Sequence, residues 1–379
     1  MIARRSFLAT TAAMGAVTLS PARLLAQSNT ITIPIRLTDD RVLIDCLLNG
    51  QGPWPLVVDT GGSVGLIEQA MVDRLELKTV GKSPLGLIGA HRVYDMVLVD
   101  ELSLGGVVRE AGALFAATDH VNFIEDAVGS LAAGVVTTMD SELDFGASQL
   151  RLYPSGAPDR SGWTRVEDAF VLEGNRYGSS WMFAPVTIGG QAFPIGLDTG
   201  SPTELRLSGE ALEKSGLWDS PRWTPGSPDG KSRIVRVPEI GFGGTVLTGL
   251  IATLTPKSPW SYFEHGLVGL PILRRFDLAT RPATKELFLR RNALPAPAPE
   301  YNRAGMWIDR AGKDVKVAVV GPGSPAAAAG IVPGDRLVGA DFQGLITAMQ
   351  GPAGTVLPLE VRSKAGSTRR MDLPLADFL

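Results

Sequence analysis

Two aspartates stand in the same tripeptide, Asp-Thr-Gly, which begins at Asp59 and again at Asp198, 139 residues apart. The first copy follows the aliphatic stretch 56–58 and the second follows the stretch 195–197. Average residue usage gives about 0.07 chance copies of such a tripeptide in a chain of this length. Two copies in matching contexts therefore predict that the aspartates face each other and form one catalytic site.

Two carboxyl groups in close contact can activate a water molecule. When they are held about 3 Å apart they cannot both ionise, so they share one proton and their pKa values split. The ionised carboxylate can take a proton from water, while the protonated carboxyl donates to a carbonyl oxygen. Such a pair suits hydrolysis of a peptide bond, because water is a weak nucleophile and an amine is a poor leaving group.

The residues that follow each aspartate suit this chemistry. Glycine lets the backbone approach closely and turn sharply, so that amides can hydrogen-bond the carboxylates. The threonine hydroxyl can connect one loop to its twin. The second tripeptide is followed by Ser201 and the first by Gly62. Because a hydroxyl can stabilise an ionised carboxylate, we expect Asp198 to be the charged partner and Asp59 the protonated one. The predicted supporting residues are Thr60, Gly61, Thr199, Gly200 and Ser201.

The elements that must position these aspartates are short strands. Residues 31–153 contain a succession of β-rich runs punctuated by glycine, proline and Asn-Gly pairs, and residues 181–290 repeat this layout. In each half a Gly-Gln turn leads into the strand before the aspartate, and a short helix follows. The later glycines Gly134 and Gly269 are 135 residues apart, close to the spacing of the aspartates. The pattern predicts two β-rich lobes of similar plan.

Over roughly residues 30–291 the sequence resembles the pepsin and retropepsin group of aspartic proteases. The two Asp-Thr-Gly motifs carry the resemblance, supported by the apolar-apolar-glycine segments 132–134 and 267–269. The short lobes look closer to two fused retropepsin-like lobes than to pepsin. The resemblance implies a mainly β fold of two pseudo-symmetric acid-protease barrels with a cleft between them. It also implies an endopeptidase that acts on polypeptides and needs no cofactor or metal.

The family also closes a mobile hairpin, or flap, over its substrate. The candidate tip is formed by Gly86, Leu87, Ile88 and Gly89, whose glycines suit a flexible turn. An ordinary hairpin turn is the alternative. The matching stretch of the second lobe, 224–237, is more polar, and we do not expect it to act as a second equal flap.

The remainder of the chain predicts a small α/β module. Residues 292–300 are rich in proline and alanine and indicate a stiff linker. The stretch 301–379 resembles the PDZ domains of bacterial exported proteases, with Ser324 as a helix N-cap and Pro325 in the first helical position. By this resemblance a loop would bind the C-terminal carboxylate of a peptide through backbone amides. That loop comprises Arg303, Ala304, Gly305 and Met306. Alternatively, the module only packs against the lobes.

The N-terminus and the charge suggest where the protein works. Residues 1–26 have two early arginines and a mildly apolar run, and they resemble the twin-arginine export signal of bacteria. A different secretory signal or an uncleaved anchor is the alternative. Without the three arginines of this segment, the net charge of −3 becomes −6. We expect a periplasmic or secreted monomer that binds no nucleic acid and has no integral membrane segment after signal removal.

The full prediction divides the chain into five parts. They are a signal peptide (1–26), a first protease lobe (30–155), a second lobe (156–291), a linker (292–300) and a PDZ domain (301–379). The histidines His91, His120 and His265 are scattered and predict no metal site, and Cys46 is expected in the core. A competing hypothesis is a non-catalytic peptide-binding or scaffold protein that retains the protease shape, motivated by Gly62 and the PDZ-like module.

Overall fold

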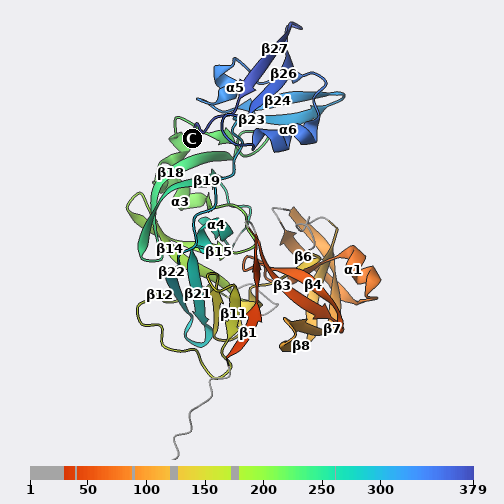
Figure 1. Cartoon of the computed structure of the whole chain (residues 1–379), viewed down its shortest axis with the longest axis vertical. Coiled ribbons are helices and arrows are strands. Elements are labelled where there is room, and N and C mark those ends of the chain that lie inside the picture. The colour runs from red at the N-terminus through yellow and green to blue at the C-terminus, as the bar shows by residue number, and fades with distance from the viewer. Residues whose placement is uncertain (1–29, 39–40, 88–89, 120–126, 172–178, 261) are drawn as a thin grey trace, which may run out of the picture.

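The computed structural model describes residues 30–38, 41–87, 90–119, 127–171, 179–260 and 262–379. The predicted signal peptide and the flap residues Ile88 and Gly89 lie outside the described residues. Two β-rich lobes lie beside each other, and a third module stands at one end, next to the second lobe (Figure 1). The strong representation of glycine and proline, 44 and 27 residues, fits this chain of short strands and tight turns.

Lobe one and lobe two contain sheets with the same strand order. In lobe one the described strands follow the order β2 (Arg36–Leu37), β3 (Val42–Leu48), β4 (Gln51–Val58), β9 (Gly129–Leu131), β5 (Gly65–Glu68), β8 (Val108–Thr118), β7 (Ala90–Leu104) and β6 (Lys78–Leu87). In lobe two they follow β13 (Phe170–Val171), β14 (Trp181–Ile188), β15 (Gln191–Asp198), β20 (Gly266–Gly269), β16 (Leu205–Leu207), β19 (Thr245–Leu254), β18 (Arg233–Phe242) and β17 (Thr224–Pro225). The two orders agree position by position, which confirms the predicted repeat.

A further sheet joins the two lobes. Its described strands follow the order β1 (Ile31–Pro34), β11 (Gln149–Leu152), β10 (Ser141–Asp144), β21 (Phe276–Arg281), β22 (Glu286–Arg291) and β12 (Thr164–Val166). At its centre β10 of lobe one pairs with β21 of lobe two, and the hydroxyls of Ser141 and Thr280 lie 2.8 Å apart. These two residues are 139 positions apart, as the aspartates are. The sheet therefore carries the pseudo-two-fold relation between the lobes.

Short helices and a shared apolar core complete the lobes. The helices are α1 (Gln69–Arg74), α2 (Gly134–Thr137), α3 (Gly209–Ser215) and α4 (Leu270–Leu273), with 3₁₀ turns at 217–219 and 282–284. One contiguous cluster of buried aliphatic and aromatic side chains extends through both lobes. Cys46 lies in it, as predicted, and burial raises the pKa of its thiol to about 12. No helix in the described part of the chain is long and apolar enough to cross a bilayer.

The strand register corrects one detail of the predicted repeat. Val58 pairs with Leu131 in lobe one, and Leu197 pairs with Val268 in lobe two. The residue that corresponds to Gly269 is therefore Ala132, not Gly134. Gly269 is required locally because a Cβ there would collide with the carbonyl oxygen of Thr203. The following helices also begin at positions that do not correspond. Helix α4 begins at Leu270, whose counterpart is Ala133, whereas α2 begins one residue later at Gly134.

The C-terminal module has a sheet and a core of its own. Its described strands follow the order β23 (Met306–Ala311), β24 (Asp314–Val320), β25 (Arg336–Leu337), β26 (Val356–Arg362) and β27 (Thr368–Pro374), with helices α5 (Pro325–Ala328) and α6 (Phe342–Met349). The Ser324 hydroxyl accepts a hydrogen bond from the Ala327 amide at 3.2 Å, which confirms the predicted N-cap. Serine suits this position because its oxygen satisfies an amide that the helix leaves unpaired.

The module is attached to lobe two through the end of the chain. Tyr301 and Phe378 are buried against Ile251 of β19. The Arg236 Nε atom donates to the carbonyl oxygen of Leu379 at 2.8 Å. The contact combines apolar burial with a charge-assisted hydrogen bond, and it holds the module beside β18 and β19 (Figure 1).

Candidate active site

The two aspartates lie at the ends of equivalent central strands. Asp59 directly follows β4, and Asp198 is the last residue of β15. Each strand has a parallel neighbour, β9 for β4 and β20 for β15, and the Asp59 amide donates to the carbonyl oxygen of Leu131 at 2.9 Å. Strands of this kind are buried on both faces, which explains the aliphatic residues before each tripeptide. The structure brings the two tripeptides together, as the sequence predicts.

The two threonines join the loops by exchanging hydrogen bonds. The Thr60 amide donates to the Thr199 hydroxyl at 3.2 Å, and the Thr199 amide donates to the Thr60 hydroxyl at 3.0 Å. Each hydroxyl in turn donates across the interface, from Thr60 to the Leu197 carbonyl at 2.8 Å and from Thr199 to the Val58 carbonyl at 2.6 Å. Both threonines are fully buried. Each hydroxyl is thus satisfied as donor and acceptor, and the loops are held as one unit.

Each glycine of the tripeptides lies against the aspartate of the other loop. A Cβ added to Gly61 would lie 2.5 Å from the Cγ atom of Asp198, and one added to Gly200 would lie 2.6 Å from the Cγ atom of Asp59. No side chain larger than hydrogen fits at these positions without displacing a carboxyl group. The crossed contacts show why glycine is needed, and they bring the two carboxyl groups face to face.

The backbone supports the two carboxyl groups unequally. Asp59 Oδ1 accepts from the amides of Gly61 at 3.0 Å and Gly62 at 3.1 Å. Asp198 Oδ1 accepts from the Gly200 amide at 2.8 Å. The Ser201 hydroxyl, which we expected to stabilise Asp198, instead accepts from the amide of Thr203 at 3.3 Å. Asp59 therefore has more hydrogen-bond donors, although its loop carries the glycine in place of the serine.

This inequality bears on which carboxyl holds the shared proton. Each carboxyl keeps some exposed surface, but protein surrounds most of it. This burial disfavours the charged form and raises the pKa of both carboxyls. Repulsion by the Asp59 charge raises the pKa of Asp198 further, well above its usual range. For Asp59, a hydrogen bond from Asp198 and the two amides oppose the rise in pKa. The hydrogen bonds and the repulsion therefore favour the charge on Asp59 and the proton on Asp198, which is opposite to the expectation from Ser201.

Residues outside the tripeptides also shape the field at the two aspartates. Arg41, which precedes β3, lowers the pKa of both carboxyls through its positive charge. Arg206 of β16 is near enough for the charge of Asp198 to act on its guanidinium. The described residues contain no group of three or more histidine, cysteine, aspartate and glutamate side chains arranged to hold a metal ion.

An aromatic cluster of lobe two borders the aspartates, and sequence reasoning missed it. Trp181 donates from Nε1 to the carbonyl oxygen of Gly61 at 3.2 Å and stacks on Tyr262, with ring centroids 4.1 Å apart. Burial and the charges of both aspartates raise the pKa of Tyr262. Phe263 packs edge-on against Tyr262 and occupies the space that a side chain at Gly196 would need. The concentration of aromatic residues at 260–263 is visible in the sequence, but nothing in the sequence indicates that it lies beside the Asp-Thr-Gly loops.

The predicted flap is a hairpin in the structure. β6 and β7 pair antiparallel up to Gly86–His91 and Leu87–Ala90, so the described strands end at the predicted tip. Leu85, Tyr94 and Met96 of this hairpin pack onto apolar side chains of lobe one. The corresponding hairpin of lobe two, β17 and β18, instead contacts strands of the C-terminal module, with Gly230 beside Val319. This agrees with the expectation that the two hairpins differ.

The loop predicted to bind a peptide carboxylate has its amides already paired. The amides of Ala304 and Gly305 donate to Asn302 Oδ1 at 3.1 and 3.0 Å, and the Arg303 amide donates to the Met349 carbonyl at 2.8 Å. Met306 is buried and paired with β24. In this conformation the amides of the loop are paired with Asn302 and the end of α6, so binding of a peptide carboxylate by the loop stays a prediction.

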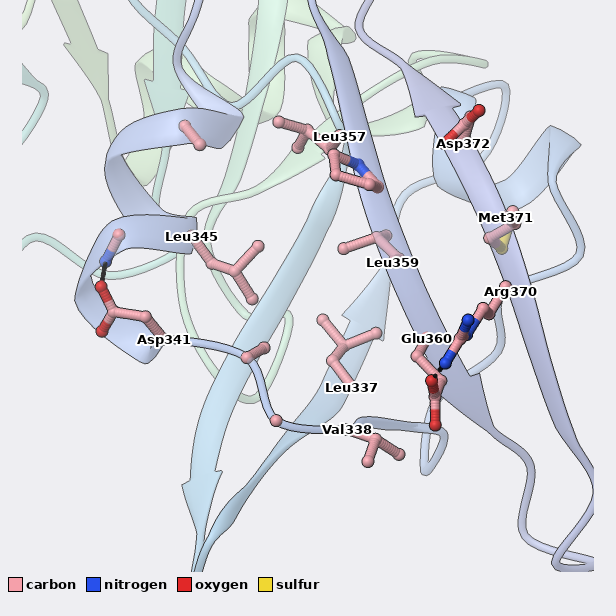
Figure 2. A pocket seen from close by; sticks show the side chains of 15 residues that line it. Leu337, Val338, Asp341, Leu345, Leu357, Leu359, Glu360, Arg370, Met371 and Asp372 are labelled. Atoms are coloured by element: carbon pink, nitrogen blue, oxygen red, sulfur yellow. Dashed lines mark hydrogen bonds and ion pairs between the residues drawn. The ribbon is translucent and has the colours of Figure 1, made fainter.

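A pocket of the C-terminal module lies away from this loop. It encloses about 580 Å³ between the segment 337–348 and strands β26 and β27 (Figure 2). Leu337, Leu345 and Leu359 point into it, and the ion pair of Glu360 with Arg370 lies at its edge. This pocket does not border the loop at 303–306.

Comparisons with known proteins bear on lobe one most directly. Residues 44–124 match the model of a family described as aspartyl protease. The predicted enzyme class, aspartic protease, is confirmed. The matched segment contains Asp59, Thr60 and Gly61 together with the flap hairpin. Among solved structures, the crystal structure of the aspartic proteinase from Irpex lacteus is similar, with 12% identity, a TM-score of 0.47, and 70% of this chain and 98% of that chain covered. The curated proteins contain no significant match.

Proposed function

We propose that this protein is an aspartic endopeptidase in which Asp59 and Asp198 activate one water molecule. The observation that carries the proposal is the crossed contact of the two loops. Each carboxyl group lies over the glycine of the opposite tripeptide, and the threonines lock this arrangement from behind. Two buried carboxyls in such contact share a proton, which provides a base and an acid at one point.

From the unequal support of the two carboxyls we also propose their separate tasks. Ionised Asp59 accepts a proton from the attacking water, and protonated Asp198 donates its proton to the carbonyl oxygen of the scissile bond. The resulting gem-diol intermediate collapses when the proton held by Asp59 passes to the departing amine and one hydroxyl of the gem-diol returns a proton to Asp198, which restores the starting protonation state. Because the pair titrates as a unit, the assignment describes the dominant protonation state before substrate is attacked.

The surroundings suit an extended polypeptide. The β6–β7 hairpin of lobe one can close over a bound strand, and the aromatic cluster of lobe two offers apolar surface next to Asp198. We propose that the C-terminal module is PDZ-like and positions substrates or regulates access, with Asn302 leaving the loop amides when a peptide carboxylate binds. We also propose export to the periplasm or outside the cell, which fractionation of cells producing the full chain tests.

The experiment is cleavage of an unstructured protein by the purified full chain between pH 4 and 7, with and without pepstatin, which mimics the tetrahedral intermediate. We expect cleavage that pepstatin abolishes. A protein that remains folded by circular dichroism and leaves the substrate intact over this pH range contradicts the proposal.

A further inference from the structure

One face of the lobe-two sheet carries Asp198 and an arginine. Across the neighbouring strands β15, β20, β16 and β19, Gly196 pairs with Leu267, Leu267 with Arg206, and Arg206 with Thr253. Paired residues point to the same face, and so does Asp198, two positions after Gly196. The opposite face is formed by the buried core residues Leu197, Val268, Leu205 and Ala252. Arg206 therefore shares the catalytic face of the sheet.

The Arg206 side chain is held in place but lacks a counter-ion. Its Nη1 atom donates to the Thr255 hydroxyl at 3.1 Å, and its guanidinium lies 5.6 Å from the ring centroid of Trp260. Among the described residues, no carboxylate forms a direct ion pair with it, although the charge of Asp198 acts on its guanidinium, and its buried Nε atom has no hydrogen-bond partner. The side chain is only half-buried. A guanidinium stays charged under all ordinary conditions and is costly to leave partly desolvated without an anion.

Lobe one has no charge at the equivalent place. Leu66 of β5 pairs with Ser130 of β9 and with Ala116 of β8, as Arg206 pairs with Leu267 and Thr253. Leu66 is 7% exposed and packs in a cluster with Leu85 and Tyr94 of the flap hairpin. The same position of the repeat is therefore apolar in lobe one and cationic in lobe two.

We propose that Arg206 binds a carboxylate of the substrate within two or three residues of the scissile bond. The inference rests on the proposed function, because it assumes that substrate lies along the face that carries Asp198. Arg206 is two strands away from the strand of Asp198, and neighbouring strands are about 4.8 Å apart. An arginine side chain spans this distance to a neighbouring side chain of an extended peptide. The carboxylate is that of an internal Asp or Glu or the C-terminal carboxylate of the peptide.

The test uses the full chain and unstructured quenched-fluorescent peptides made in pairs. Members of one pair carry Glu or Gln at a single position near the cleaved bond, and members of a second pair end in a free acid or an amide. The variants are Arg206→Gln, Arg206→Lys and, as a matched control, Arg109→Gln, whose arginine is exposed on lobe one and paired with Glu101. Circular dichroism and thermal melting establish that each variant is folded.

In one of the two pairs, we expect wild type to cleave the acidic peptide with a kcat/KM roughly 10-fold to 100-fold higher than that of its neutral counterpart. This is the factor that one charge-assisted hydrogen bond contributes. Arg206→Gln abolishes this preference, Arg206→Lys retains part of it, and Arg109→Gln leaves it unchanged. A preference in the Glu/Gln pair identifies a side-chain carboxylate, and one in the acid/amide pair identifies the peptide C-terminus. If Arg206→Gln slows both members equally, the inference is overturned while the proposed function stands.

A binding measurement separates the two proposals if wild type cleaves none of the peptides. Fluorescence anisotropy then compares the affinity of the same pairs for wild type and Arg206→Gln. A preference for the carboxylate that disappears in Arg206→Gln supports the inference although the proposed function has failed. Equal binding of acidic and neutral members by wild type overturns it.

Discussion

Lobe one and lobe two share one strand order but treat their aspartates differently. The threonines and glycines of the two loops are used in the same way, each reaching across to the opposite loop. The amides are not, since two donate to Asp59 Oδ1 and one to Asp198 Oδ1. The comparison teaches that the repeat builds the frame of the site symmetrically, whereas small differences in loop backbone give the two carboxyls unequal support.

The lobes differ again around this frame. The hairpin of lobe one is paired to its tip, whereas that of lobe two contacts the C-terminal module. The face beside the aspartate carries Leu66 in lobe one and Arg206 in lobe two. One duplicated scaffold thus carries an apolar residue in lobe one and a cationic residue in lobe two at the equivalent place beside the aspartates.

The largest effect is expected at the two loop glycines, which both lobes use in the same way. Gly61→Ala and Gly200→Ala each place a methyl group on the opposite carboxyl, and displacement of a catalytic group by about 1 Å costs roughly 100-fold or more in rate. Both variants should therefore lose cleavage to a similar extent. Gly81→Ala is the matched control, because nothing lies within 4 Å of a Cβ at that position. Retained activity in Gly200→Ala contradicts the crossed contact.

The threonine exchange should appear in stability. Thr60→Val or Thr199→Val leaves one amide and one carbonyl buried without their partners, so each should lower the free energy of unfolding by roughly 2–5 kcal/mol. Denaturant unfolding measures this change. Thr79→Val on the exposed side of β6 serves as control. A large loss for one threonine and none for the other shows that the exchange is not reciprocal.

The raised pKa values predict how stability depends on pH. The folded carboxyl pair holds its shared proton at a pH at which the unfolded aspartates, with pKa near 3.9, have released theirs. Stability therefore falls as pH rises above about 4 and through the raised pKa of Asp198, by about 1.4 kcal/mol per pH unit for one proton. Asp198→Asn should remove most of this dependence and gain stability relative to wild type at neutral pH. Thermal melts of both proteins from pH 4 to 7 measure it, and parallel curves contradict the assignment.

The smallest effect is expected at the residue that distinguishes the two motifs. Ser201→Gly should change kcat by less than about threefold, because the hydroxyl accepts from the Thr203 amide and does not contact Asp198. Gly62→Ala should be the more damaging change, since its Cβ would lie 3.2 Å from Asp59 Oδ2. If Ser201→Gly shifts the pH profile and Gly62→Ala does not, the protonation assignment is reversed.

Much of the frame could be predicted because it is repeated in the sequence. The tandem Asp-Thr-Gly motifs, their aliphatic strands and the loop threonines are all local patterns. The unequal support of the two carboxyls could not be predicted, because it comes from backbone amides and every residue except proline carries one. Arg206 was missed because only strand register places it on the face of Asp198. The aromatic cluster was missed because Trp181 and the loop at 260–263 meet only in the folded chain. In the C-terminal module the helix cap was predictable, whereas the pairing of the loop amides depends on the single side chain of Asn302.

The most direct test of one catalytic site built from both lobes is cleavage by single aspartate variants. Purified Asp59→Asn and Asp198→Asn are compared with wild type and with Asp73→Asn, whose aspartate lies on exposed α1. We predict that each active-site variant loses at least about 10³-fold in kcat/KM while remaining folded, because either change removes the shared acid and base. Asp73→Asn should cleave as wild type does. Undiminished cleavage by either folded active-site variant contradicts the account.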